Sequence, residues 1–172
     1  FAVPWLARKI GKRNVLMGSL IIQGFGLLII YFAPFENMTM VLTGCWVFGL
    51  ANVGFPMTLS MVADSVDYME LKTGVRTDGT AYATYGLATK LGNAIGASAG
   101  VLVLAAFGYV AGAEQTAQTM NGINMVVNLI PAILFFLSAG CCLLWNMSDK
   151  EADEIRVELK ERKELITEKE EN

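Results

Sequence analysis

Histidine is absent from the sequence, and cysteine occurs only as Cys45, Cys141 and Cys142. The missing histidines exclude histidine-based proton relays and most transition-metal sites. The cysteines form neither a CxxC pair nor an even-numbered framework, so the sequence predicts no zinc site and no disulfide scaffold. It also offers no nucleophile–base pair and no phosphate-binding loop. We therefore expect neither an enzyme nor a bound cofactor or metal.

Charged residues make up only 17% of the chain, against 54% hydrophobic residues, and 16 of the 29 lie in residues 149–172. The rest contains four long stretches nearly free of charge. They lie at about 14–33, 39–62, 80–109 and 122–147. Each is long enough to cross a hydrocarbon core of about 30 Å as a helix. The sequence predicts an all-α membrane protein, with residues 1–147 forming a partial transporter-like bundle and residues 148–172 a cytoplasmic tail helix.

The chain opens on Phe1, in the apolar run FAVPWLA, with no charged residues before it. A signal peptide would carry such charges, so we interpret the run as the end of an earlier membrane helix. On this interpretation the chain is the C-terminal piece of a longer protein.

Basic residues fall in every second connection between the apolar stretches. The connection at 8–13 (RKIGKR), the connection near 63–79 and the tail contain lysine or arginine, whereas PFENM and the connection near 110–121 contain none. Lysine and arginine are enriched on the cytoplasmic side of membrane proteins. The pattern predicts a multi-pass protein of the cell (inner) membrane with both ends of the chain in the cytoplasm.

The RKIGKR connection has two interpretations. It is a topology determinant alone, or it is a conformational latch. In the second case Gly11 allows a tight turn, and the cations reach helix C-termini or nearby carboxylates.

The second apolar stretch contains a proline well inside it. Pro56 removes a backbone donor, which predicts a bend in the helix. The bend is either an ordinary kink or a place where Phe55 and Asn52 lie beside a substrate path, with the aromatic ring stacked on a sugar.

Residues 63–90, ADSVDYMELKTGVRTDGTAYATYGLATK, form a polar cassette between the second and third apolar stretches. Helical spacing places Asp64 and Asp67 on one face with Glu70 near it, and the glycines of TGVRTDG predict a turn around Arg76. These charges form either a solvated loop or a gate whose ion pairs reach another helix bundle. Exposed pairs contribute about 0–1 kcal/mol each, so such a gate opens readily.

Lys90 is the only charged residue between Asp78 and Glu114. A lysine inside a membrane helix either snorkels to the interface or faces a polar cavity. Because Lys90 lies about 15 Å along a helix from Gly79, we favour the cavity. The hydroxyl-bearing residues on or beside the same helix face are Tyr82, Tyr85 and Thr89. A cation beside hydroxyls suits a polyol or a carboxylate.

Other patterns predict packing. Gly92, Gly96 and Gly100 recur at a four-residue period, which predicts a helix-packing surface. Asn124 and Asn128 share a helix face and are expected to bond between helices.

The tail begins with a capping-box pattern and continues with a thin apolar stripe. The residues of these two tail features are Ser148, Glu151, Ile155, Leu159 and Ile166.

The segment ADSVDYMELKTGVRTDGTAYA, followed by TKLGNAIG, resembles the glycoside–pentoside–hexuronide:cation symporters. This group contains the melibiose and glucuronide carriers and lies within the major facilitator superfamily. The resemblance covers most of the chain from about residue 8 to 163, including GYVA and DKEADEI. It implies twelve membrane helices in two halves, of which this chain holds about helices 9 to 12.

The resemblance also implies residue roles. Lys90 matches a lysine near the sugar and cation sites, and Tyr85, Gly86 and Thr89 fall where the same helix lines the sugar pocket. Phe55 falls where melibiose carriers have a tryptophan, and Tyr85 where they have a glutamine. A glucuronide or pentoside is therefore a better expectation than a galactoside.

The cassette charges Asp64, Asp67 and Arg76 match the cytoplasmic gate of that family. Its cation-binding carboxylates lie in the first half. The residues that we expect at the substrate and cation sites are Lys90, Tyr85, Thr89, Tyr82, Gly86, Phe55 and Asn52, and those expected at the gate are Asp64, Asp67, Arg76 and Glu70.

These observations predict secondary active transport of a sugar or glycoside, coupled to sodium or protons by alternating access. The expected partners are the sugar, the lipid bilayer and the missing N-terminal half of the same protein, with no nucleic acid. The alternative is a non-transporting membrane scaffold or sensor, in which the charges serve topology only and Lys90 tolerates leucine. A soluble α-helical protein, a third class, would have to stay dispersed without detergent.

Overall fold

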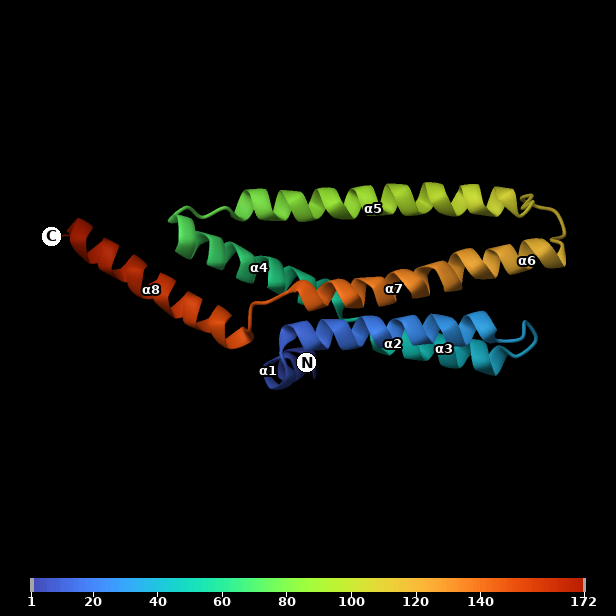
Figure 1. The fold of residues 1–172 in the computed structure, drawn as a ribbon, viewed down its shortest axis with the longest axis horizontal. Coiled ribbons are helices and arrows are strands. Elements are labelled where there is room, and N and C mark those ends of the chain that lie inside the picture. The colour runs from blue at the N-terminus through green and yellow to red at the C-terminus, as the bar shows by residue number, and fades with distance from the viewer. Residues whose placement is uncertain (1, 172) are drawn as a thin grey trace.

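The computed structural model describes residues 2–171, and every regular element in that range is a helix. The elements are α1 (Ala2–Ile10), α2 (Lys12–Phe32), α3 (Met38–Leu50), α4 (Gly54–Thr73), α5 (Asp78–Ala106), α6 (Ala117–Asn124), a π-helical turn (Met125–Leu129), α7 (Ile130–Cys141), a 3-10 turn (Cys142–Leu144) and α8 (Asp149–Glu171). Figure 1 shows α2 to α7 running lengthwise, with α8 projecting at one end.

Four stretches of residues 2–171 are long and apolar enough to cross a membrane. They are Lys12–Phe32, Met38–Thr73, Asp78–Ala106 and Ala117–Leu144. Four spans and an all-α fold were predicted, and both predictions are confirmed. The second span runs to Thr73 rather than 62, and the last begins at Ala117 rather than 122.

The base-containing segments gather at one end of the bundle. Figure 1 places the start of α2, the connection between α4 and α5, and α8 toward the same end, on the left. The connections from α2 to α3 and from α5 to α6 lie at the other end. We call the end that carries Arg8 to Arg13, the α4–α5 turn and α8 the basic end.

The second span is broken in the middle, but not where proline predicts. The helix stops at Leu50 and restarts at Gly54, so Pro56 is the third residue of α4. Proline costs no hydrogen bond in the first turn, because the early N–H groups of a helix have no partner there. The break instead involves Gln23 of α2, which is 3% exposed and donates from Nε2 to the Ala51 carbonyl at 2.9 Å.

The last span contains a π-helical turn just before Pro131. A proline lacks the N–H that an α-helix requires, and a π turn is one way to absorb that loss. Asn124 donates from Nδ2 to the Tyr31 carbonyl of α2 at 2.9 Å, and Asn128 donates to Asn124 Oδ1 at 2.8 Å. The predicted bond between helices is therefore confirmed.

Close packing concentrates around α2. A Cβ at Gly26 would lie 2.8 Å from the backbone nitrogen of Phe48, and one at Gly44 would lie 2.8 Å from the Gly26 carbonyl oxygen. A Cβ at Gly24 would lie 2.8 Å from the Phe136 ring of α7. Small residues allow membrane helices to approach closely where no hydrophobic effect drives them together.

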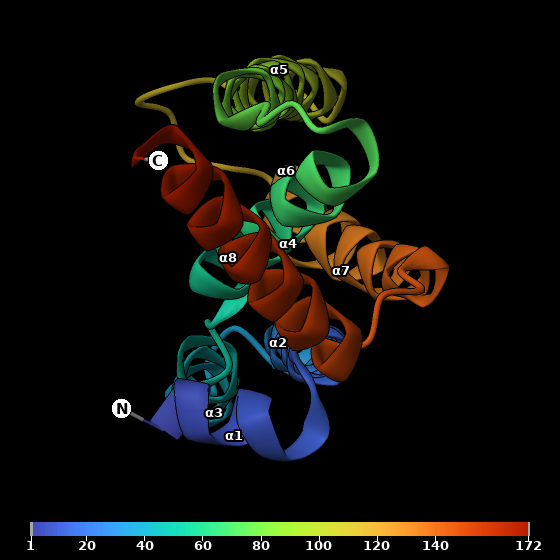
Figure 2. The same cartoon turned by 90° about the vertical axis from the view of Figure 1, so that its left-hand side faces the viewer.

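Helix α5 stands apart from this packing. None of its residues is buried, and Figures 1 and 2 both show it separated from the other long helices along most of its length. A Cβ at Gly100 would lie 3.7 Å from Val126, whereas Gly92 and Gly96 face open space. Of the predicted packing stripe, only Gly100 has a neighbour among the described residues.

Candidate functional site

The acidic face of α4 is the centre of the site. Asp64, Asp67 and Glu70 follow one another at three-residue steps, so they descend one side of the helix. Asp64 is only 3% exposed and Glu70 is also buried. A buried carboxylate is stable only with cations or donors close by, and the structure supplies them from three segments of the chain.

Asp64 lies between two cations from opposite ends of the sequence. Lys12, at the start of α2, approaches Asp64 Oδ2 with its Nζ at 2.6 Å. Arg156, in the second turn of α8, donates through Nη2 to Asp64 Oδ1. One carboxylate therefore ties together α2, α4 and α8.

Glu70 forms a second junction two turns further along α4. Arg76 donates to Glu70 Oε2 at 2.7 Å, and Lys163 of α8 lies 2.7 Å from Glu70 Oε1. Arg76 also makes a two-point contact with Asp78. Asp67 lies between the two junctions, 3.5 Å from both Arg76 and Arg156. We call these residues, with Lys12 and Asp64, the charge network.

The electrostatics keep Arg76 ionised. Its hydrogen bond to Asp78, followed by that to Glu70, raises the pKa of the guanidinium above its usual value. A basic group whose pKa is raised by folding stabilises the folded state at every pH below its ordinary pKa. That stabilisation is lost only when the pH rises through the raised pKa. The contribution of Arg76 is thus present throughout the physiological range.

The RKIGKR connection makes the contacts that the latch interpretation requires. Gly11 has φ 89°, a value that favours glycine. It allows the Lys12 amide to donate to Asp149 Oδ2 at 2.9 Å, at the start of α8. Arg13 donates through Nη2 to the Leu143 carbonyl at 3.2 Å, at the end of the last span. The contacts to a carboxylate and to a helix C-terminus are confirmed, and the latching action stays a prediction.

The tail helix is docked on the bundle rather than only lying on its surface. Its capping box forms, with the Glu151 amide donating to Ser148 Oγ at 3.2 Å and the Ser148 amide donating to Glu151 Oε2 at 3.4 Å. The residues of α8 buried against the bundle include Ala152, Ile155 and Leu159. The side chain of Ile166, predicted to continue this stripe, lies outside the described part of the structure.

Sequence reasoning missed Arg156 and Lys163 as partners of the gate acids. All four predicted gate residues do meet in one network, and its cations come from the start of α2, from the α4–α5 turn and from α8. The apolar stripe of the tail was the signal that could have identified Arg156 and Lys163. An amphipathic helix packs its apolar face on the bundle, and the cations beside that face then lie close to the acids of α4. Figure 2 shows α8 running across α4.

The predicted substrate residues lie on α5 and at the break of the second span. Lys90 is exposed and makes no ion pair or hydrogen bond with another described residue. Thr89 donates its hydroxyl to the Tyr85 carbonyl at 2.7 Å, within its own helix, and Gly86 has open space beside it. Tyr82 is 41% exposed. Their shared face is thus uncovered, and the predicted polar cavity stays a prediction.

Asn52 and Phe55 lie at the break between α3 and α4, and both are exposed. Neither of them forms a hydrogen bond with Lys90 within residues 2–171. In the same part of the chain, no group of three histidine, cysteine, aspartate or glutamate side chains is placed to hold a metal ion.

Comparisons with known proteins give the family. The MFS/sugar transport protein family matches residues 1–148. The chain is 36% identical over 146 residues to the isoprimeverose transporter of Lactiplantibacillus pentosus, covering 84% of this chain and 30% of that protein. It is 29% identical over 167 residues to the glucuronide carrier protein homolog of Escherichia coli, covering 95% of this chain and 36% of that protein.

The chain thus spans about a third of the length of the relatives it matches. No solved structure matches it. The match confirms the resemblance read from the cassette, and the family is one of transporters rather than enzymes. The chain belongs to the MFS/sugar transport protein family of the major facilitator superfamily.

Proposed function

We propose that this chain forms part of a carrier that moves a sugar or glycoside together with sodium or protons by alternating access. The family and the names of its relatives support a sugar-like solute. The observation that carries the proposal is the charge network, because it joins three segments at one end of a membrane bundle through ion pairs that can break and reform.

In this proposal the charge network is the cytoplasmic gate. Helix α4 runs from the break at Ala51 to the network at the basic end, so the break serves as its hinge. While Asp64 and Glu70 hold their cations, α4, the start of α2 and α8 stay together. When those pairs open, the basic end opens to the cytoplasm. Partly exposed cations suit this role, since Arg156 and Lys163 are each about half exposed to water.

Lys90 provides the charge balance of the transport site. It lies near the middle of α5, beside the hydroxyls of Tyr85 and Thr89. An uncovered face with a cation and hydroxyls suits a sugar or glucuronide, and an upstream half of the protein covers it and supplies the coupling carboxylates. Sugar and cation couple because each favours the same occluded state.

Cation-driven uptake in the full-length carrier tests this proposal. Lys90→Ala is expected to abolish uptake of glucuronides and isoprimeverose under an imposed sodium or proton gradient, with the amount of protein in the membrane unchanged. Lys160→Ala is the matched control, because Lys160 is exposed and pairs only with Glu164 at 3.8 Å. Unchanged uptake by Lys90→Ala would rule out the role of Lys90.

The same preparation separates a carrier from a scaffold or sensor. A carrier binds the sugar more tightly with sodium or at the favoured pH than without. A scaffold shows no sugar binding under either condition, and Lys90→Leu does not change that result.

A further inference from the structure

A cavity of about 690 Å³ opens at the basic end, between α1 and the starts of α4 and α8. Its lining combines cations with apolar residues. The cations are Arg8, Lys12, Lys150 and Arg156, and the apolar residues are Ala7 and Met57. The charge network contributes Lys12 and Arg156 to the lining, whereas Arg8 and Lys150 take no part in that network.

Two of the four cations are free for a ligand. Lys12 and Arg156 are neutralised by Asp64, and Arg156 also by Asp153. Arg8 and Lys150 make no ion pair with any residue whose side chain the structure describes. Asp149, the other acid in the lining, accepts the Lys12 amide. The lining holds four cations against two acids, Asp149 and Asp153, so its net charge is positive, and Arg8 and Lys150 come from two different helices.

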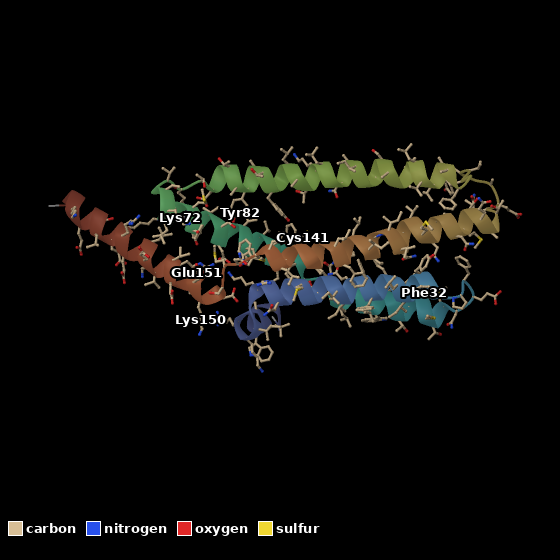
Figure 3. All side chains as sticks on the ribbon, viewed as in Figure 1. Phe32, Lys72, Tyr82, Cys141, Lys150 and Glu151 are labelled. Carbon is tan, nitrogen blue, oxygen red and sulfur yellow. The ribbon has the colours of Figure 1, made fainter. Side chains whose placement is uncertain are left out.

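The position of the cavity matches the membrane boundary. Arg8 lies four residues before the first span begins at Lys12, and Lys150 lies six residues after the last span ends at Leu144. Figure 3 shows Lys150 in the first turn of α8, at the end of that helix next to α1. Basic pockets at this depth on the cytoplasmic side bind anionic lipid head groups.

Helix α1 carries exposed apolar side chains next to its basic residues. Figure 1 shows it at the basic end, beside the start of α2. Trp5 is 63% exposed, Leu6 and Ile10 are also exposed, and Lys9 lies 5.3 Å from the centre of the Trp5 ring. Tryptophan beside basic residues is typical of the boundary between the membrane and water.

We propose that this cavity binds the phosphate of an anionic phospholipid from the cytoplasmic leaflet, held between Arg8 and Lys150. The two cations contact the phosphate oxygens, while Ala7 and Met57 contact the glycerol and the upper acyl chain. The apolar lining and the exposed side chains of α1 favour a lipid over free phosphate. The bound lipid fastens α1 to α8, and the inference depends on membrane insertion but not on which solute is carried.

Thermal unfolding of the full-length carrier in detergent tests the site by titration with dioleoylphosphatidylglycerol. The double variant Arg8→Gln/Lys150→Gln is expected to weaken the apparent affinity for this lipid about 25-fold, since each cation near a lipid surface contributes about fivefold. The charge-keeping variant Arg8→Lys/Lys150→Arg retains the affinity. So does Arg162→Gln/Lys169→Gln, which removes two exposed cations from the far part of α8.

Two other ligands separate a lipid site from a general membrane effect and from a free-anion site. Dioleoylphosphatidylcholine is expected to stabilise the wild-type carrier much less than phosphatidylglycerol, and equal stabilisation would overturn the proposal. Inorganic phosphate that stabilises as strongly as the lipid at equal phosphate concentration identifies a free-anion site and also overturns it. If the glutamine variant does not fold without lipid, loss of affinity in the charge-keeping variant still contradicts the proposal.

Discussion

At the scale of single residues, Asp64 explains why the basic end holds together. Removing a carboxylate from water is costly, and the cost is offset only when cations contact it directly. Lys12 and Arg156 do so from two helices, and Lys12 retains little exposure. Gln23 plays a comparable role for the Ala51 carbonyl. Asp64 and Gln23 are thus each buried with a partner already in place.

Replacing Asp64 with asparagine should therefore destabilise the carrier. Asp64→Asn leaves Lys12 largely buried without a counter-ion, and breaking such a pair costs about 3–5 kcal/mol. The measurement is the midpoint of thermal unfolding in detergent. Asp153→Asn is the control, because Asp153 is 75% exposed and also pairs with Arg156. If both variants unfold at the same temperature, Asp64 does not hold the basic end together.

At the scale of elements, α8 is a docked helix with its own buried stripe. Ala152, Ile155 and Leu159 face the bundle, while Arg156 and Lys163 beside them contact the acids of α4. The capping box starts the helix at the position that orients this face. Packing and ion pairing thus act on the same side of α8.

Shortening one packed side chain should loosen the tail. Leu159 is 5% exposed, and Leu→Ala substitutions at buried sites cost about 2–5 kcal/mol. Leu159→Ala is expected to make α8 cleavable by a protease added at the basic end, while the membrane spans stay intact. Leu165→Ala, at a 58% exposed position, should leave the cleavage rate unchanged. Slow cleavage of both variants would show that the stripe does not hold the tail.

The elements also show what sequence reasoning can reach. Apolar length located all four spans, because a stretch nearly free of charge has few alternatives to a membrane helix. The sequence placed the bend of the second span at Pro56, whereas the helix breaks at Ala51. The position of the break depends on Gln23 from a neighbouring helix and not on the proline. The gate acids were found from their spacing. Arg156 and Lys163 were not, because the spacing of acids on α4 does not identify which helix supplies the cations.

At the scale of the whole molecule, the chain consists of a packed part and an uncovered helix. The start of α2, the second half of α4 and the part of α8 from Arg156 to Lys163 meet in the charge network, whereas α5 buries none of its residues. The face that carries Lys90, Tyr85 and Thr89 is left uncovered by the described residues 2–171. The sequence indicated those residues by type and position, but a pattern within one helix does not identify what packs against it.

The reaction of a cysteine at position 90 tests the central claim most directly. In a full-length carrier whose Cys45, Cys141 and Cys142 are replaced by serine, Lys90→Cys should react with a membrane-impermeant thiol reagent, and a transported sugar should slow that reaction. Leu102→Cys, on an apolar turn of α5, should stay unreactive with or without sugar. A cysteine at position 90 that does not react, or that reacts at the same rate with sugar present, would contradict a water-filled transport site at Lys90.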